Sequence, residues 1–272
     1  MAQGTGDGAT GAGPSFPLTQ TPEAEATGRG GFLSVDLLHY DTPDGFNEWT
    51  DIKGDTEKMV SHHIRTVTVQ LTEVYHAFAL AHALNRTLIM PRVQCWCIQN
   101  WFENPLCRLP GDLHTRFPLV CPADFLFDMN KLYSVEVQGV RVPIREYSFL
   151  DNPRRPRDAP LVVTVDAALT FSAQYSEAGH ALKVPANADD ADLAKALAPY
   201  QAKYARIHIA APPSTVLRAI RSKAKRDAFD TVMKQLPVEW CCRPDVVVKA
   251  HSELPLRHQF EMLPSMTKPS EA

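Results

Sequence analysis

The chain of 272 residues is long enough for one ordinary domain with flexible ends, and 44% of its residues are hydrophobic and 22% charged. A formal net charge of −3 provides no basic field of the kind that attracts nucleic acid or anionic lipid, so we expect no nucleic-acid partner. No stretch of about 18 apolar residues occurs, so we also expect no membrane-spanning segment in this sequence.

Both ends of the chain have a composition typical of disorder. Residues 1–30 are rich in Gly, Ala, Thr and Pro and contain almost no apolar side chains. Such a segment cannot bury enough surface to offset the conformational entropy that folding removes. Residues 251–272 have the same character, and we expect a flexible tail there. We therefore predict a single α/β domain over residues 31–250.

A long amphipathic helix is the clearest element of the sequence. Apolar residues recur with a period near 3.6 from about Asp55 to Leu84, and Asn85 is a plausible C-terminal stop. The apolar segment 87–90 follows, and Pro91 ends it, which predicts a short buried strand. A long helix that leads directly into such a strand is typical of an α/β fold.

Further strands and helices alternate along the chain. Short apolar runs at 32–40, 161–165 and 206–210 predict strands, and we expect helices over 191–198 and 214–236. This alternation favours a Rossmann-like, mainly parallel sheet flanked by helices. Between Cys95 and Pro160 the pattern is irregular, so we expect a long loop region that contains cysteines, and long loops are often functional.

The cysteines are compatible with two kinds of chemistry. They are Cys95, Cys97, Cys107, Cys121, Cys241 and Cys242. An even number permits disulfides in an oxidising compartment, and the sequence leaves their pairing open. The first four could instead bind zinc, but the single residue between Cys95 and Cys97 departs from the usual spacing of zinc ligands. We therefore expect disulfides and no metal site in this chain.

The acidic cluster Asp189–Asp192 contains the Asp-x-Asp pattern with which many sugar transferases bind a metal ion and a diphosphate. Such a clamp needs a loop at a strand end, so that both carboxylates converge on the ion. These residues stand instead at the predicted start of a helix, where the dipole favours acidic groups, and we interpret them as helix caps. The sequence contains no dinucleotide-binding, phosphate-loop or esterase motif, so those three classes have no support.

Two loops concentrate charged and aromatic residues. Arg86 stands at the entrance to the strand at 87–90, and the segment 145–154 mixes charges, aromatics and turn formers. An arginine in either loop could hold a phosphate or carboxylate through two hydrogen bonds. Arg145 could equally form a local ion pair with Glu146. Of the adjacent His62 and His63 on the long helix, only one can face a site.

Several of these segments, taken in order, resemble the C-terminal domain of the extensin arabinosyltransferases, which are plant and algal enzymes of glycosyltransferase family 77. The segments are His62-His63, 83–91 (ALNRTLIMP), the Cys95/Cys97 loop, 107–111 (CRLPG), 121–124 (CPAD), 145–153 (REYSFLDNP) and 240–242 (WCC). Together they span about residues 32–245. The segment 84–91 alone is also similar to protein O-fucosyltransferases, which have a comparable nucleotide-sugar fold.

The resemblance implies a protein of the Golgi lumen that acts on hydroxyproline-rich cell-wall glycoproteins. Members of the family transfer arabinofuranose from a uridine diphosphate donor, usually with a divalent cation such as manganese. They also carry an N-terminal membrane anchor and a separate domain with the Asp-x-Asp motif. This sequence contains neither feature, so we expect part of such an enzyme, without its main catalytic domain and without a cofactor of its own.

The resemblance also directs our prediction of binding residues. The residues that match its motifs, and that we expect to contact a donor or acceptor, are His63, Arg86, Asp124, Arg145, Glu146, Asp151 and Asn152. No residue is assigned a catalytic role.

Two alternatives remain open. The chain could be a non-catalytic module that binds a glycan or a polypeptide, in which Trp96, Trp101, Phe102 and Tyr147 stack on sugar rings. It could also be a self-sufficient transferase in which Arg86 or Arg145 holds the diphosphate without a metal ion.

Overall fold

The computed structural model describes residues 31–50, 53–98, 107–108, 112, 114–153, 159–169 and 173–236. The two ends that we expect to be flexible lie outside these residues. So do Trp101, Phe102, Cys241 and Cys242.

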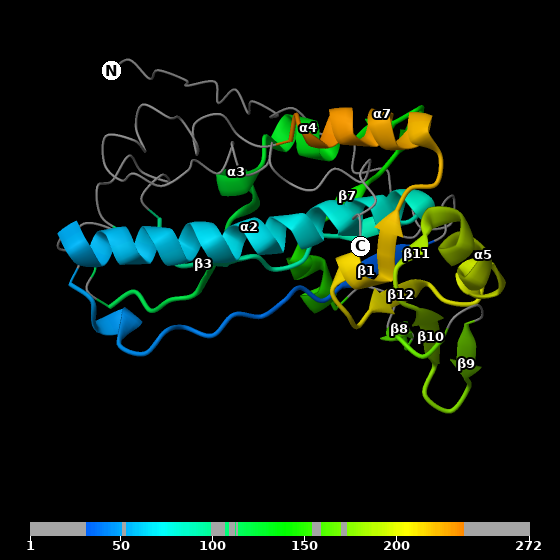
Figure 1. Ribbon diagram of the computed structural model, residues 1–272, viewed down its shortest axis with the longest axis horizontal. Coiled ribbons are helices and arrows are strands. Elements are labelled where there is room, and N and C mark those ends of the chain that lie inside the picture. The colour runs from blue at the N-terminus through cyan, green and yellow to red at the C-terminus, as the bar shows by residue number, and fades with distance from the viewer. Residues whose placement is uncertain are drawn as a thin grey trace, which may run out of the picture.

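A seven-stranded, mainly parallel sheet is the centre of the fold (Figure 1). Its strands, in spatial order, are β7 (Ile144–Arg145), β2 (Thr87–Ile89), β1 (Phe32–Val35), β12 (Arg206–Ile209), β8 (Leu161–Asp166), β10 (Ala181–Pro185) and β9 (Gln174–Ser176). Neighbouring strands are parallel except β9, which pairs antiparallel with β10. The predicted α/β fold with a mainly parallel sheet is confirmed, although β1 is shorter than the apolar run at 32–40.

The strand order puts β1 at a point where the direction of winding changes. With the parallel strands numbered along the chain, the order is 3-2-1-6-4-5. The half 3-2-1 matches the dinucleotide-binding order, whereas the other half does not. From β1 the chain moves to β2 and β7 on one side, and it reaches the other neighbour of β1 only with β12. In open α/β sheets, ligands bind outside the carboxyl ends of the strands at such a point.

Helix α2 (Lys53–Ala83) is the predicted long helix, and it packs against the sheet and against two later helices. Asn85 follows it with a left-handed φ of 51°, so the predicted stop is confirmed. The other helices are α3 (Ala123–Leu126), α4 (Met129–Tyr133), α5 (Asp190–Gln201), α6 (Pro213–Val216) and α7 (Lys223–Met233), with the 3-10 helices η1 (Phe46–Glu48) and η3 (Tyr147–Asp151).

The main core lies on the face of the sheet that α2 covers. Alternate strand residues such as Leu33, Leu88 and Ile207 are fully buried in this core. Their neighbours on the opposite face are mostly polar. Those of β12, β8 and β10, such as His208 and Thr164, are mostly only partly buried, whereas those of β1 and β2 are buried. A parallel sheet is usually apolar on both faces, so this alternation marks the second face as unusually polar.

The helix that we predict over 214–236 is not continuous, and this part of the prediction is wrong. The segment forms α6, then strand β13 (Leu217–Ala219), then α7. Strand β13 pairs with β11 (Ala188–Asp189), and this backbone pairing interrupts the helix. Ser222 then caps α7 by accepting a hydrogen bond from the backbone N–H of Lys225. Val216, Leu217 and Phe229 therefore lie in three different elements.

The acidic cluster at the start of α5 has the capping role that we predict. The Asp189 carboxylate accepts hydrogen bonds from the backbone N–H groups of Ala191 and Asp192. Arg221 forms ion pairs with Asp189 and Asp192, at 2.7 and 2.8 Å, and the Lys225 ammonium lies 2.8 Å from Asp190. These carboxylates therefore join α5 to the segment around α7.

The N-terminal half of α2 extends beyond the sheet and packs into a second, smaller core (Figure 1). Met59, Val60 and Ile64 of this half are buried against Phe46 and Trp96. Three two-stranded sheets accompany the main sheet: β3 (Gln94–Cys95) with β4 (Leu119–Val120), β5 (Glu136–Val137) with β6 (Val140–Arg141), and β11 with β13. Disulfides link Cys95 to Cys121 and Cys97 to Cys107, so these four cysteines are not zinc thiolates.

Arg86 holds together the amino ends of the first two strands and the end of α5. Its side chain is 1% exposed, and its guanidinium donates five hydrogen bonds. Four go to the backbone carbonyls of Phe32, Ala205, Gln201 and Tyr204, and the fifth goes to the Gln201 side chain. Burial lowers the pKa of Arg86 to about 10, so the group stays charged at neutral pH.

We expect the Arg86→Met variant to be strongly destabilised. The substitution keeps apolar volume but leaves several buried carbonyls without a donor, which should lower the free energy of unfolding by about 3 kcal/mol or more. Urea unfolding followed by circular dichroism measures this change. The matched control is Arg116→Ala, because Arg116 is 67% exposed and its loss should change the free energy by less than about 1 kcal/mol. Equal stability of the two variants would contradict the structural role of Arg86.

Candidate functional site

A cleft lies outside the carboxyl ends of β1 and β2 and has a volume of 520 Å³. It is lined by the residues that follow these strands, by η3 and by two glutamines from α2 and β3: Ser34–His39, Gln70, Ile89–Arg92, Gln94, Tyr147, Leu150 and Asp151. Its position is the one at which ligands bind in open α/β sheets, and its volume is within the usual range for small-molecule sites, about 300–1,000 Å³.

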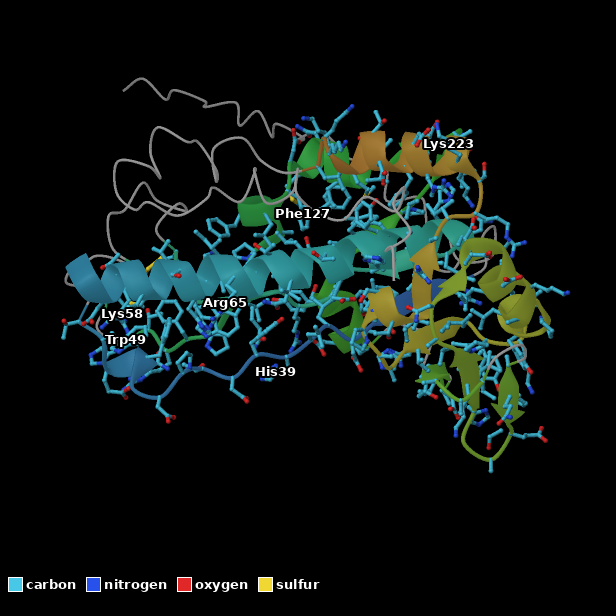
Figure 2. All side chains as sticks on the ribbon, viewed as in Figure 1. His39, Trp49, Lys58, Arg65, Phe127 and Lys223 are labelled. Carbon is cyan, nitrogen blue, oxygen red and sulfur yellow. A yellow bond between two sulfur atoms is a disulfide. The ribbon has the colours of Figure 1, made fainter. Side chains whose placement is uncertain are left out.

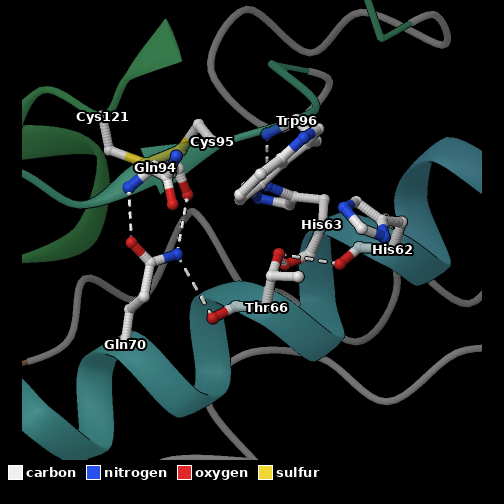
Figure 3. The surroundings of a disulfide bond; sticks show 8 residues. All are labelled: His62, His63, Thr66, Gln70, Gln94, Cys95, Trp96 and Cys121. Atoms are coloured by element: carbon white, nitrogen blue, oxygen red, sulfur yellow. Dashed lines mark hydrogen bonds between the residues drawn. A yellow bond between two sulfur atoms is a disulfide. The ribbon is translucent and has the colours of Figure 1, made fainter. Parts of the chain in front are cut away.

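Two glutamine side chains set the wall of the cleft by pairing with backbone, and Figure 3 shows the pairing of Gln70. The amide of Gln70 donates to the carbonyl of Gln94 and accepts from its N–H, at 3.2 and 2.7 Å. The side chain of Gln94 pairs in the same way with the backbone of Tyr40, at 3.3 and 2.9 Å. These hydrogen bonds link helix α2 to strand β3, and strand β3 to the segment after β1.

Arg92 provides the positive charge of the cleft. Pro91 ends β2, and Arg92 follows it with a side chain that is 59% exposed. Its guanidinium lies 4.8 Å from the centre of the Tyr147 ring and 3.5 Å from the Asp151 carboxylate. Among the described residues it is the one lysine or arginine that lines the cleft. An exposed guanidinium held over an aromatic ring can receive an anionic group of a ligand.

Ser34 and Asp36 line the cleft and form a polar cluster with His208, on the polar face of the sheet. The Nδ1 atom of His208 lies 3.1 Å from the Ser34 hydroxyl, and its Nε2 atom lies 3.4 Å from the Asp36 carboxylate. Asp36 is 63% exposed and can accept a hydrogen bond from a hydroxyl in the cleft. The segment after β1 also carries His39, on the side of α2 where Arg65 projects (Figure 2).

A second hollow, here called the groove, lies next to the cleft and has a volume of 480 Å³. It shares Met90, Pro91 and Tyr147 with the cleft. The rest of its lining is mostly apolar and comes from β4, α3, α4 and β7: Val93, Val120–Asp124, Leu126, Phe127, Met129, Leu132, Tyr133, Ile144 and Glu146. Asp124 and Glu146 are its charged residues.

Three of the residues that we predict to bind a ligand line these two hollows. Asp151 lines the cleft, and Asp124 and Glu146 line the groove. Arg145 and Asn152 are their immediate neighbours along the chain, at the end of β7 and directly after η3. The structure therefore brings together the residues of the 145–153 segment and Asp124.

Arg86 and His63 lie elsewhere, and both are buried. Arg86 is at the amino ends of the strands, the opposite edge of the sheet from the cleft. His63 is 5% exposed, and its Nδ1 atom accepts a hydrogen bond from the backbone N–H of Trp96 (Figure 3). We therefore assign both residues a structural role. Trp96 is fully buried as well, so the interpretation that its ring stacks on a sugar is wrong.

The sequence did not direct us to Arg92, Gln70, Gln94 or the cluster around His208. For Gln70 a signal exists, because it is a polar residue within the apolar stripe of the long helix. Arg92 stands just beyond the predicted strand at 87–90, at the edge where ligands bind in α/β folds, whereas Asp36 lies inside the run at 32–40 that we predict as a strand. Nothing in the sequence indicates that His208 lies beside Ser34, because that contact depends on the pairing of β1 with β12.

Sequence comparison gives one relative with a known activity class. The chain is 37% identical over 127 residues to Arabinosyltransferase XEG113 of Arabidopsis thaliana. By this match, the chain is related to arabinosyltransferases. The matched region covers 44% of this chain and 19% of the relative, so the chain spans about a fifth of that protein. No family model and no solved structure match the sequence.

The described residues contain no group of three or more His, Cys, Asp or Glu side chains placed to hold a metal ion. No described helix has the length and apolarity needed to cross a membrane.

We expect His63 to make the protein sensitive to acid. Burial, with a smaller contribution from His62, lowers the pKa of His63 to about 3. Below pH 6.5 the unfolded chain therefore takes up a proton that the folded chain does not, and stability falls as the pH decreases towards 3. The expected contribution is about 1.4 kcal/mol per pH unit over most of this range.

Urea unfolding of the wild type and of His63→Gln between pH 7 and pH 4 measures this contribution, because glutamine can still accept the hydrogen bond from Trp96. The difference in slope between the two proteins isolates His63 from His76 and His82, whose pKa values burial also lowers. His39→Gln is the control, since His39 is exposed. Parallel slopes for wild type and His63→Gln would show that His63 is not held neutral.

Proposed function

We propose that this chain is a nucleotide-sugar-binding domain of an arabinosyltransferase. The observation that carries the proposal is the cleft at the carboxyl ends of β1 and β2, with Arg92 on its rim, in a chain related to an arabinosyltransferase. The diphosphate of a donor would lie against Arg92, which stacks on Tyr147 and can exchange its contact with Asp151 for a phosphate.

The sugar would lie deeper in the cleft, next to the polar cluster. Asp36, Gln70 and Gln94 line the cleft, and both types of group, carboxylate and amide, hydrogen-bond to hydroxyls. Gln70 would act as an acceptor, because both of its amide hydrogens are bonded to the carbonyls of Thr66 and Gln94. The two glutamines are already held by backbone, so their positions are set before a ligand binds. Groups positioned in advance reduce the entropy that is lost on binding.

The finer points of the proposal rest on the family resemblance. The donor would be uridine diphosphate arabinofuranose, and the acceptor a hydroxyproline-rich cell-wall glycoprotein. The two disulfides support an oxidising compartment, as the Golgi lumen would provide. The Asp-x-Asp motif and the divalent cation would belong to another domain, with this chain contributing binding rather than the metal-assisted step.

The proposal predicts that Arg92→Ala weakens binding of uridine diphosphate by about tenfold or more, the effect expected for loss of one charge-assisted contact. Isothermal titration calorimetry measures the affinity. The control is Arg116→Ala, because Arg116 is also an exposed arginine with one exposed carboxylate partner, Glu48, and does not line the cleft.

Uridine monophosphate serves as a second probe. If Arg92 contacts the distal phosphate, the wild type should bind the monophosphate more weakly, and Arg92→Ala should affect this ligand less. A folded wild-type chain that binds neither nucleotide would contradict the proposed function, and so would equal effects of Arg92→Ala and Arg116→Ala.

A further inference from the structure

The groove exposes apolar side chains in a way that the rest of the described surface rarely does. Val120 and Tyr133 are 41% and 43% exposed, and they are two of the four large apolar side chains that the described residues leave exposed. Both line the groove. Contiguous apolar surface with a polar rim is typical of a place where another molecule binds.

A disulfide and a helix cap hold the backbone around the groove in place. The disulfide between Cys95 and Cys121 ties β4, which carries Val120, to β3. Helix α4, which carries Tyr133, begins at Asp128, whose carboxylate accepts hydrogen bonds from two backbone N–H groups of its first turn. A ligand would therefore meet a surface whose backbone is already in place.

The charged residues that line the groove are both acidic. Glu146 and Asp124 are its charged lining residues, and both are exposed. The Tyr133 hydroxyl lies 3.3 Å from a Glu146 carboxylate oxygen, and burial together with Glu146 raises the pKa of Tyr133. Among the described residues, no ion-pair partner engages Asp124. Two carboxylates beside apolar surface favour a ligand that carries both apolar groups and a positive charge, and they disfavour phosphates and anionic lipids.

We propose that the groove binds an extended polypeptide segment that contains lysine or arginine among apolar residues. Its apolar side chains would pack on Val120 and Tyr133, and its cation would lie against Asp124 and Glu146. Only Met90, Pro91 and Tyr147 separate the groove from the cleft, so a side-chain hydroxyl of the bound segment would lie next to the proposed donor. The assignment of this segment as acceptor rests on the proposed function, whereas the binding of the segment does not.

The test uses two fluorescent synthetic peptides, one of alternating valine and lysine and one in which glutamate replaces lysine. Fluorescence anisotropy measures their binding to the whole chain. We expect the lysine peptide to bind and the glutamate peptide to bind at least about tenfold more weakly, since like charges would then be juxtaposed. Equal binding of both peptides would overturn the proposal.

Substitutions of groove residues test whether the lysine peptide binds in the groove. Glu146→Gln and Asp124→Asn should each weaken binding of the lysine peptide several-fold, and Tyr133→Ala should weaken it through lost apolar contact. The control is Glu136→Gln, because Glu136 is an exposed carboxylate on nearby β5 that does not line the groove. Circular dichroism checks that each variant is folded. Binding that is unchanged in the first three variants, or lost equally in the control, would overturn the assignment.

Titration of uridine diphosphate into the same variants separates the two proposals. We expect Glu146→Gln and Asp124→Asn to bind the nucleotide as the wild type does, because neither residue lines the cleft. Peptide binding without nucleotide binding would support the groove and contradict the proposed function. Nucleotide binding without binding of the lysine peptide would contradict the groove and leave the function supported.

Discussion

The excess length of α2 over the sheet that it covers decides where the site lies. Its 31 residues span about 46 Å, whereas strands of three to six residues span about 10–20 Å. From Val67 onward the apolar side chains of α2 belong to the main core, and those before it belong to the smaller core with Phe46 and Trp96. The helix thus forms a wall beyond the carboxyl ends of the strands, and Gln70 stands where the sheet ends and this wall begins.

The one-sided core of the sheet has a second consequence. Since the helices bury one face, the other face needs no continuous apolar surface, and Ser34 and His208 can occupy it. On this face η3 adds apolar packing to β1, where the Phe149 ring lies 4.7 Å from that of Phe32. This contact holds the 3-10 helix against the sheet at the amino end of β1, and the same helix contributes Tyr147 and Asp151 to the cleft. The packing of one aromatic pair therefore positions two residues of the site.

Local patterns in the sequence were sufficient for the elements that depend on local physics. The period of α2, the stop at Asn85 and the caps at Asp189 each involve residues within a few positions of one another. The interrupted helix at 214–236 was missed because β13 forms only by pairing with β11, about 30 residues earlier. In the same way, the buried role of Arg86 depends on carbonyls more than 100 residues away, so its position before a strand did not indicate it.

The two hollows share one wall, formed by Met90, Pro91 and Tyr147. Pro91 lacks rotational freedom about φ, and Tyr147 is held beneath the guanidinium of Arg92. A glycosyl transfer needs a donor and an acceptor hydroxyl held side by side while water is kept out, and alignment of two bound partners supplies much of the rate in such reactions. Under the proposed function, Arg92 would hold the donor on one side of this wall, and Asp124 and Glu146 would hold the acceptor segment on the other. In that proposal the chain would contribute to transfer by aligning two bound substrates across one wall.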